Sequence, residues 1–250
     1  MKPKVSIITV CYNSAKTIED TIQSVINQTY PNIEYIIVDG LSNDNTLEVV
    51  EKYTTQISKI VSENDNGLYD AINKGIELAT GDIIAILNSD DFYVDNKVIV
   101  DVVSKMIEEE SDTLYADLYY VDAIDTNKVV RNWVSGKYAD GLFFKGWMPP
   151  HPTFFVKKEV YNKYGKFNLE LKSAADYELM LRFIHKNKCS VSYLPRTVVR
   201  MRIGGVSNVS LLNRLKANRE DKKAWEINGL KPKPYTLLFK PLSKLGQFFK

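Results

Sequence analysis

The sequence predicts an α/β protein with a mostly parallel sheet flanked by helices, and two observations favour this class. From residue 5 to residue 87, short apolar runs alternate with segments whose apolar residues recur at helical spacing. A chain of 250 residues, 44% of them hydrophobic, can also bury the core that such a sheet needs. Strand–helix–strand units of this length join parallel strands through right-handed crossovers, so we expect a Rossmann-like sheet.

Each element of the first half has its own signal. β-branched residues mark the strands, helical spacing marks the helices, and Asn43-Asp44 can cap one of those helices. The expected strands cover residues 5–10, 33–40, 57–61 and 81–87, and the expected helices cover residues 18–26, 47–53 and 68–79.

The pattern is less regular after residue 92. The expected elements are a helix at 95–110, a strand at 114–121, a helix at 173–186, strands at 191–194 and 198–202, and a polar helix at 210–227. Residues 136–152 are rich in Gly, Trp and Pro, which favours a binding loop. Because no second core is indicated, we expect one domain over residues 1–230, followed by a basic tail at 231–250.

Composition excludes several classes of protein. No apolar run approaches the roughly 20 residues of a membrane-spanning helix, and the apolar content is too high for a disordered chain. The first residues lack a signal-peptide pattern and two cysteines are too few for a disulfide framework, so we expect a cytosolic protein. The histidines and cysteines have no zinc spacing, and neither a Gly-x-Gly-x-x-Gly nor a Walker lysine motif is present. We expect no nucleic-acid partner.

The net charge of +2 hides a division along the chain. Residues 1–185 carry 18 Lys and Arg against 28 Asp and Glu, a net charge of −10, whereas residues 186–250 carry 15 against 3, a net charge of +12. One interpretation is solvated faces of different sign. The other is an acidic catalytic part beside a basic flank that meets a phosphate or a membrane surface.

Polar side chains follow four of the expected strands. They are Tyr12 and Asn13, then Asp39, then Glu63 and Asp65, and finally Asn88, Asp90 and Asp91. The carboxyl ends of parallel strands meet at one edge of a sheet, which is where such sheets bind ligands. Crowded carboxylates need a cation to relieve their repulsion, and oxygen ligands suit Mg²⁺ or Mn²⁺.

Five blocks in this order resemble family 2 glycosyltransferases, and the likeness is closest to small enzymes of bacterial capsule, exopolysaccharide and lipopolysaccharide assembly. The blocks are residues 5–13, 35–46, 63–75, 88–91 and 175–182. The resemblance implies a GT-A fold, with a nucleotide-sugar half at about 1–110 and an acceptor half at about 111–230. It also implies inverting transfer of a sugar from a nucleotide diphosphate sugar.

The fourth block resembles the metal-binding Asp-x-Asp element of that family. Asp91 is accordingly our first choice of ligand for Mn²⁺ or Mg²⁺, and Asp90 is assigned to the ion or to the nucleoside ribose. An ion bridging the donor phosphates would act as Lewis acid and template. The alternative is that the Asp pair caps the helix that begins near Asp95.

The resemblance assigns the first two strand ends to the nucleotide. Asp39 would accept from the ring N–H of a pyrimidine base, while Thr9, Val10 and Tyr12 would hold the base at the exit of the first strand. The alternatives are that Asp39 caps the turn that follows it and that Tyr12 is a core aromatic.

The third block would serve the nucleotide through Asp65, Gly67 and Asn73. Many relatives carry an arginine in this stretch to meet the phosphates, whereas Ile72 and Asn73 stand here. We therefore assign the phosphate cation to Arg200 and Arg202, which with Ser207 flank a glycine pair. The alternative is that they are surface arginines on an edge strand.

Asp176 is the expected catalytic base, in the first turn of a helix. Because Asp is favoured in a first turn by the helix dipole, a structural role is the alternative. His151, in the proline-rich loop, resembles a position that lines the acceptor or metal side in some relatives, and its alternative is plain exposure.

Together these features predict a metal-dependent inverting glycosyltransferase that uses a UDP-sugar. The expected acceptor is a lipid-linked sugar or a growing glycan. The rival hypotheses are a nucleotidyltransferase or another Mg²⁺-dependent enzyme on a similar sheet, and a non-catalytic nucleotide-sugar binder. The basic tail either lies on an anionic membrane surface or packs on the protein.

Overall fold

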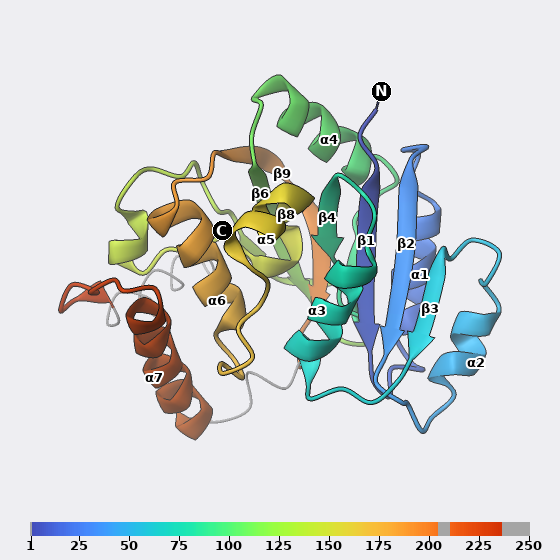
Figure 1. Ribbon diagram of the computed structural model, residues 1–250. Helices are drawn as coiled ribbons and strands as arrows, with labels where there is room; N and C mark the ends of the chain where they lie inside the picture. Colours follow the sequence, from blue (N-terminus) through green and yellow to red (C-terminus); the bar gives the residue numbers. More distant parts are fainter. Residues whose placement is uncertain (1, 205–210, 237–250) are drawn as a thin grey trace.

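The computed structural model describes residues 2–204 and 211–236, and the side chains of residues 219–236 within the second range. Nine strands form one sheet in the order β3-β2-β1-β4-β8-β6-β9-β5, and β7 pairs with β6 (Figure 1). The strands are β1 (Val5–Cys11), β2 (Ile33–Asp39), β3 (Lys59–Ser62), β4 (Ile83–Ile86), β5 (Asp91–Tyr93), β6 (Thr113–Val121), β7 (Val129–Trp133), β8 (Phe155–Lys157) and β9 (Val191–Arg202).

Helices cover this sheet. They are α1 (Ile18–Ile26), α2 (Thr46–Glu51), α3 (Leu68–Leu78), α4 (Val98–Glu108), α5 (Lys158–Tyr164), α6 (Ala175–Met180) and α7 (Leu211–Ile227), with short 3₁₀ turns at Leu142–Lys145 and His151–Thr153. A π-helical segment, Leu181–Lys186, continues α6. Together α6 and that segment cover most of the range expected to be one helix.

The first half of the sheet has the expected parallel arrangement. β1 is buried along its whole length and pairs in parallel with β2 and β4, and β2 pairs in parallel with β3. Helix α3 packs closely on β1, because a Cβ atom on Gly75 would lie only 2.4 Å from Cγ2 of Ile8. Strands buried on both faces read as continuous apolar runs, which is why these were visible in the sequence.

The second half of the sheet is mixed, which corrects the expectation of a mostly parallel sheet. β6 and β9 are parallel, but β8 pairs antiparallel with both β4 and β6, and β5 and β7 also pair antiparallel. No crossover helix separates β6 from β7, so the chain turns back directly as a hairpin. Strands β5, β7 and β8 were not expected, because each is too short to show periodicity.

The two strands expected at 191–194 and 198–202 are one strand, β9. Its pairing with β6 runs through Leu194 and resumes at Thr197, with irregular register between them. Pro195 has no N–H to donate to a neighbouring strand, and this interruption reads in the sequence as a strand end.

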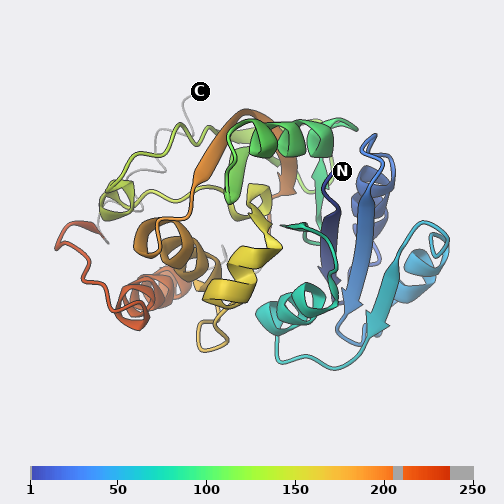
Figure 2. The same cartoon turned by 45° about the horizontal axis from the view of Figure 1, so that its top comes forward.

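Helix α7 packs against α6 at the end of the molecule far from β2 and β3 (Figure 1, Figure 2). Among the residues that the structure describes, no helix combines the length and apolar character needed to cross a bilayer. Most of the basic tail, residues 237–250, lies outside the described residues, so its role stays a prediction.

Candidate functional site

The loops after β1 and β2 are joined by direct hydrogen bonds. The Asn13 main-chain N donates to Oγ of Ser42 over 2.8 Å, and the Asn43 main-chain N donates to Oδ1 of Asn13 over 2.8 Å. A further hydroxyl pair, Ser14 and Ser89 at 2.8 Å, ties the first loop to the end of β4. The strand ends therefore lie at one edge of the sheet, as the sequence predicts.

Asp39 is fully buried at this edge. One carboxylate oxygen accepts from the main-chain N of Ser42 at 3.0 Å and from Oγ of Ser62 at 2.7 Å, and the other accepts from the Ser42 hydroxyl. The structure thus shows Asp39 capping the turn after β2, which is the alternative considered for it. Its contact with a nucleotide base stays a prediction.

The residues at the end of β1 differ in exposure. The side chains of Thr9 and Val10 are buried, and Oγ1 of Thr9 accepts a hydrogen bond of 3.1 Å from the Tyr35 hydroxyl. Only the main chain of these two residues is left to meet a nucleotide, because their side chains belong to the core. Tyr12, in contrast, is 59% exposed and is not a core aromatic.

Asp65 and Tyr12 converge on Gly40, a residue that the site prediction missed. A Cβ atom on Gly40 would lie 2.4 Å from Oδ2 of Asp65 and 3.6 Å from the Tyr12 ring. Oδ1 of Asp65 accepts from the main-chain N of Gly67 at 2.8 Å, and Gly67 has φ of 110°, where glycine is favoured. Three strand ends therefore bring an aromatic face and a carboxylate together around a glycine.

Asn73 is engaged within the protein, and its assignment to the nucleotide stays a prediction. Its amide is buried and pairs with both main-chain groups of Phe167, donating to the carbonyl and accepting from the N–H at 2.9 Å each. Asn73 therefore fastens α3 to the loop that precedes α6.

Asp91 is fully buried at the start of β5. Among the described residues Oδ1 has no direct hydrogen-bond partner, and Oδ2 accepts from the Asn88 amide at 3.4 Å. Burial, followed by the neighbouring Asp90 carboxylate, raises the pKa of Asp91 well above its usual value, while the charge and the main chain of Arg202 act to lower it. A buried carboxylate oxygen without a partner fits a cation ligand, since an unpaired buried acceptor is otherwise costly.

The protein supplies few further ligands near Asp91. Within the described ranges, no three His, Cys, Asp or Glu side chains are placed to hold a metal ion. The residues present therefore fit an ion that Asp91 and Asp90 would hold and that would take its other ligands from outside the protein.

Asp176 and His151 meet although 25 positions separate them in the sequence. Nδ1 of His151 lies 3.4 Å from Oδ2 of Asp176, while Oδ1 of Asp176 accepts from the main-chain N of Tyr177 at 2.8 Å. The Asp176 side chain keeps 19% of its surface exposed and that of His151 keeps 37%. This pair has the access and the orientation that a general base requires.

Tyr120, on β6, is buried, and charges from three residues act on its phenol. Burial raises the pKa of its phenol, Arg131 lowers it, and the carboxylates of Asp91 and Asp176 each raise it. The guanidinium of Arg131 lies 4.7 Å from the centre of the Tyr120 ring and 5.5 Å from that of Trp133. Because Tyr120 and Arg131 are paired across the β6–β7 hairpin, both lie on one face of the sheet.

We call Tyr120, Arg131 and Trp133 the aromatic shelf. The rings of Tyr120 and Trp133 are nearly parallel, at 5°, with centroids 6.3 Å apart. None of the three was among the expected site residues, because β7, with the sequence Val-Val-Arg-Asn-Trp, shows no alternation that marks a strand.

Arg200 and Arg202 lie on the opposite face of the sheet from Asp91, and their assignment to donor phosphates stays a prediction. Asp91 pairs with Met201 across β5 and β9, so the residues on either side of Met201 point the other way. Nη1 of Arg202 donates to the Asp90 carbonyl at 2.7 Å, and its guanidinium also pairs with Asp20. Nη1 of Arg200 donates to the Thr126 carbonyl at 3.1 Å.

Ser207, assigned with these two arginines, lies outside the described residues. The prediction that it contacts the donor therefore stays a prediction.

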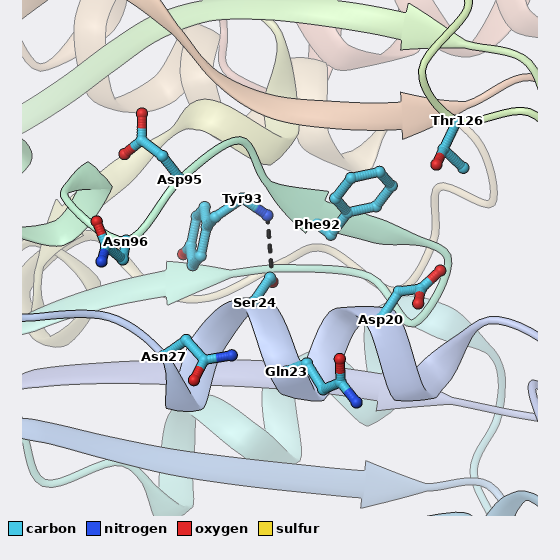
Figure 3. Close-up of a pocket in the computed structure, with 9 residues that line it drawn as sticks. All are labelled: Asp20, Gln23, Ser24, Asn27, Phe92, Tyr93, Asp95, Asn96 and Thr126. Atoms are coloured by element: carbon cyan, nitrogen blue, oxygen red, sulfur yellow. Dashed lines mark hydrogen bonds between the residues drawn. The ribbon is translucent and has the colours of Figure 1, made fainter.

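A small polar pocket of about 320 Å³ lies on this opposite side, between α1 and β5 (Figure 3). Its lining residues are Asp20, Gln23, Ser24, Asn27, Phe92, Tyr93, Asp95, Asn96 and Thr126. Figure 3 shows that the Tyr93 main-chain N donates to the Ser24 hydroxyl, over 3.2 Å. None of the acids assigned to chemistry lines this pocket, so it is not the candidate site.

Sequence comparison finds a match to the family model described as glycosyl transferase family 2, over residues 6–165. The chain is 29% identical over 210 residues to a Mycobacterium bovis PGL/p-HBAD biosynthesis glycosyltransferase, which covers 82% of this chain and 80% of that protein. It is 32% identical over 180 residues to the glycosyltransferase GlyG of Streptococcus pneumoniae, covering 65% of this chain and 60% of GlyG.

Solved structures show the same fold. TarS residues 1–349 from Staphylococcus aureus, in complex with UDP-GlcNAc, match with a TM-score of 0.69 at 20% identity, over 90% of this chain and 65% of the TarS chain. PcManGT, a mannosyltransferase from Pyrobaculum calidifontis in complex with GDP-Man and Mn²⁺, matches with a TM-score of 0.70 at 19% identity, over 98% of this chain and 70% of the other. The chain therefore belongs to glycosyltransferase family 2, has the GT-A type of fold and is a glycosyltransferase.

Proposed function

We propose that this protein is a divalent-metal-dependent inverting glycosyltransferase that moves a sugar from a UDP-sugar to a hydroxyl of a lipid-linked or growing glycan in surface polysaccharide biosynthesis. The observation that carries the proposal is the contact of the Asp176 carboxylate with His151, in a chain whose buried Asp91 keeps one oxygen without a partner among the described residues. A nucleotide-sugar donor is supported by the UDP-GlcNAc and GDP-Man bound to the structural neighbours. Surface polysaccharides are supported by the relative TuaG of Bacillus subtilis, a putative teichuronic acid biosynthesis glycosyltransferase that is 40% identical over 100 residues, 39% of this chain and 40% of TuaG.

Asp91 and Asp90 are the residues that would hold the divalent ion. When bound there, the ion would supply charge neutralisation for the donor diphosphate as it departs. The buried position of Asp91 strengthens this interaction, because a low local dielectric screens charges less than water does.

Asp176 would remove the proton from the acceptor hydroxyl. The acceptor oxygen bonds to the anomeric carbon, the bond from that carbon to the diphosphate oxygen breaks, and the proton passes to the Asp176 carboxylate. His151 and the Tyr177 main chain orient that carboxylate from opposite oxygens. Because the acceptor oxygen attacks from the side opposite to the departing diphosphate, a single displacement inverts the configuration of the anomeric carbon.

The nucleotide would lie at the strand ends where Tyr12, Gly40 and Asp65 converge. Tyr12 offers an exposed ring for stacking on the base, and the absent side chain of Gly40 leaves room beside Asp65. As the residue that meets the donor phosphates, we propose Arg131 in place of Arg200 and Arg202, because Arg131 lies on the same face of the sheet as Tyr120. A guanidinium there can pair with phosphate oxygens in two directions at once.

The test separates chemistry from binding by replacing Asp176. With UDP-sugars as donors and lipid-linked saccharides as acceptors, Asp176→Asn should lower turnover by roughly 10²–10⁴-fold, since this is the usual contribution of a general base. UDP affinity, measured by calorimetry, should change less than about twofold. The control is Asp140→Asn, an exposed acid paired with Lys188.

Each rival has its own outcome in that experiment. Retained turnover in Asp176→Asn would favour a nucleotidyltransferase, which does not need this base. UDP binding by the wild-type protein without transfer from any UDP- or GDP-sugar would favour a non-catalytic binder.

A further inference from the structure

Helix α6, which carries Asp176, begins without a capping side chain of its own. The residue before the helix is Ala174, and no side chain at that position accepts from the free N–H groups of the first turn. Glu220 of α7 instead holds the two residues just before the helix: its Oε2 accepts from the Ser173 main-chain N at 2.7 Å, from the Ser173 hydroxyl at 2.8 Å and from the Ala174 main-chain N at 3.1 Å. Glu220 therefore caps α6 through the N–H of the residue that precedes its first turn, from 46 positions further along the chain.

The hydrogen bonds favour the ionised form of Glu220. Burial alone would raise the pKa of this carboxyl, but the hydrogen bonds from residues 172–174 outweigh it and lower the pKa. An ionised carboxylate accepts stronger hydrogen bonds than a neutral one.

Two further contacts hold α7 against α6. Nε1 of the fully buried Trp225 donates to the Tyr177 hydroxyl at 2.9 Å, and the Asn228 amide donates to Oε1 of Glu178 at 2.9 Å. Tyr177 and Glu178 directly follow Asp176 in the chain. These two contacts fix α6 after Asp176, whereas the Glu220 contact fixes the start of the helix before Asp176.

The other side of that turn is held by α3. Burial raises the pKa of the Tyr69 phenol, the main chain of Ala175 and Asp176 acts to lower it, and the Tyr69 ring stacks on Phe167 with centroids 5.5 Å apart. The start of α6 thus lies between a residue of the nucleotide half and a residue of the last helix. Either contact alone would leave the turn free to shift toward the other.

We propose that Glu220 is a positioning residue for the reaction: it caps the base-bearing helix from α7 and so fixes the Asp176 carboxylate against His151. This inference rests on the role proposed for Asp176. A displacement of about 1 Å in a reacting group can cost on the order of 10²-fold in rate, so a cap that sets this position affects turnover without contacting substrate.

Three variants of α7 test the inference. Glu220→Ala should lower kcat by about 10–30-fold and leave the donor KM within about twofold, because donor binding does not use Asp176. Glu220→Gln, whose amide oxygen still accepts hydrogen bonds, should recover at least about a third of the lost rate. The matched control is Glu226→Ala, which removes an exposed acid of the same helix paired only with Lys222 among the ion pairs of the described residues.

A double-mutant cycle separates positioning from a general loss of fold. If Glu220 acts through Asp176, adding Glu220→Ala to Asp176→Asn should change the residual turnover by less than about twofold. Wild-type kcat in Glu220→Ala would overturn the inference, and so would an equal loss of donor affinity and turnover. If Asp176→Asn itself keeps full turnover, the proposed function fails rather than this inference.

Discussion

The two faces of the β5–β9 strand pair differ in how their charged side chains are partnered: Asp91 lies on one face, and Arg200 and Arg202 lie on the other. On one face, Oδ1 of Asp91 has no hydrogen-bond partner among the described residues, and strand register places Tyr120 and Arg131 on the same face of the sheet. On the other face, Arg202 is engaged by the Asp20 carboxylate, by the Asp90 carbonyl and by the Phe92 ring 4.9 Å away.

This difference shows that a shift of one residue along β9 decides whether a side chain faces the candidate site or the opposite side of the sheet. Side chains alternate between the two faces of a strand. Met201 therefore lies on the same face as Asp91, and the next residue, the cationic Arg202, lies on the opposite face. Buried polar groups are nearly always hydrogen-bonded, yet among the described residues both Oδ1 of Asp91 on one face and Nε of Arg200 on the other lack a partner. The Asp91 oxygen is the unpaired acceptor that suits a cation, whereas Arg202 on the other face holds the Asp90–Asp91 turn in place through the Asp90 carbonyl.

The largest expected difference between the faces lies between two arginines. If Arg131 meets the donor phosphates, Arg131→Ala should lower kcat/KM for a UDP-sugar by about 30–100-fold, since hydrogen bonds to charged groups are worth roughly 2–3 kcal/mol. Arg200→Ala, on the opposite face, should change it by less than about twofold. Steady-state kinetics on both variants measures the contrast, and equal losses would erase the distinction between the faces.

A second prediction sharpens the contrast between partnered and unpartnered buried carboxylates. Glu34 is buried like Asp91, but its oxygens accept from Ser6, Thr80 and Lys4. Burial alone would raise the pKa of Glu34, yet these hydrogen bonds lower it to about 2. Because this is below the unfolded value of about 4.3, the ionised group stabilises the fold above that pH, and the stabilisation is lost as the pH falls toward 2.

Replacing Glu34 should therefore cost stability mainly at neutral pH. Glu34→Gln should lower the free energy of unfolding by roughly 2 kcal/mol at pH 7 and by much less near pH 2. Urea unfolding across this range measures both numbers. An identical loss at every pH would show that packing, and not the charge, is responsible.

The smallest expected effect is at the strand ends where Tyr12, Gly40 and Asp65 converge. A Cβ atom on Gly40 would displace the Asp65 carboxylate, so Gly40→Ala should weaken UDP binding by about 10-fold, the equivalent of one lost hydrogen bond of roughly 1.4 kcal/mol. Since the displaced atom is the end of a flexible side chain, the melting temperature should barely change. In an Asp65→Ala background the same substitution should have no further effect on affinity, and a full additional loss would contradict the arrangement.

Much of the fold could be predicted because the parallel strands are buried on both faces and therefore read as apolar runs. β1 and β2 lie within one residue of their expected ranges. The hairpin of β6 with β7 could not be predicted, because its second strand is short and partly exposed. The aromatic shelf depends on that hairpin and was missed with it.

Candidate site residues that lie in the sequence blocks could be predicted, whereas contacts that depend only on tertiary packing were missed. The meeting of His151 with Asp176 was not predicted, although both residues were chosen separately. The face on which Arg200 and Arg202 lie depends on the register of β9, which no spacing in the sequence reveals. The Glu220 cap comes from a helix whose polar pattern reads as plain surface.

The central claim is that Asp91 is the ligand of a divalent ion needed for nucleotide binding. A thermal-shift titration with UDP, with Mn²⁺, and with both together tests it in the wild-type protein and in Asp91→Ala. We predict that UDP and Mn²⁺ together raise the melting temperature of the wild-type protein well beyond either alone, and that Asp91→Ala folds but loses this joint effect. The same joint stabilisation in Asp91→Ala would contradict the account.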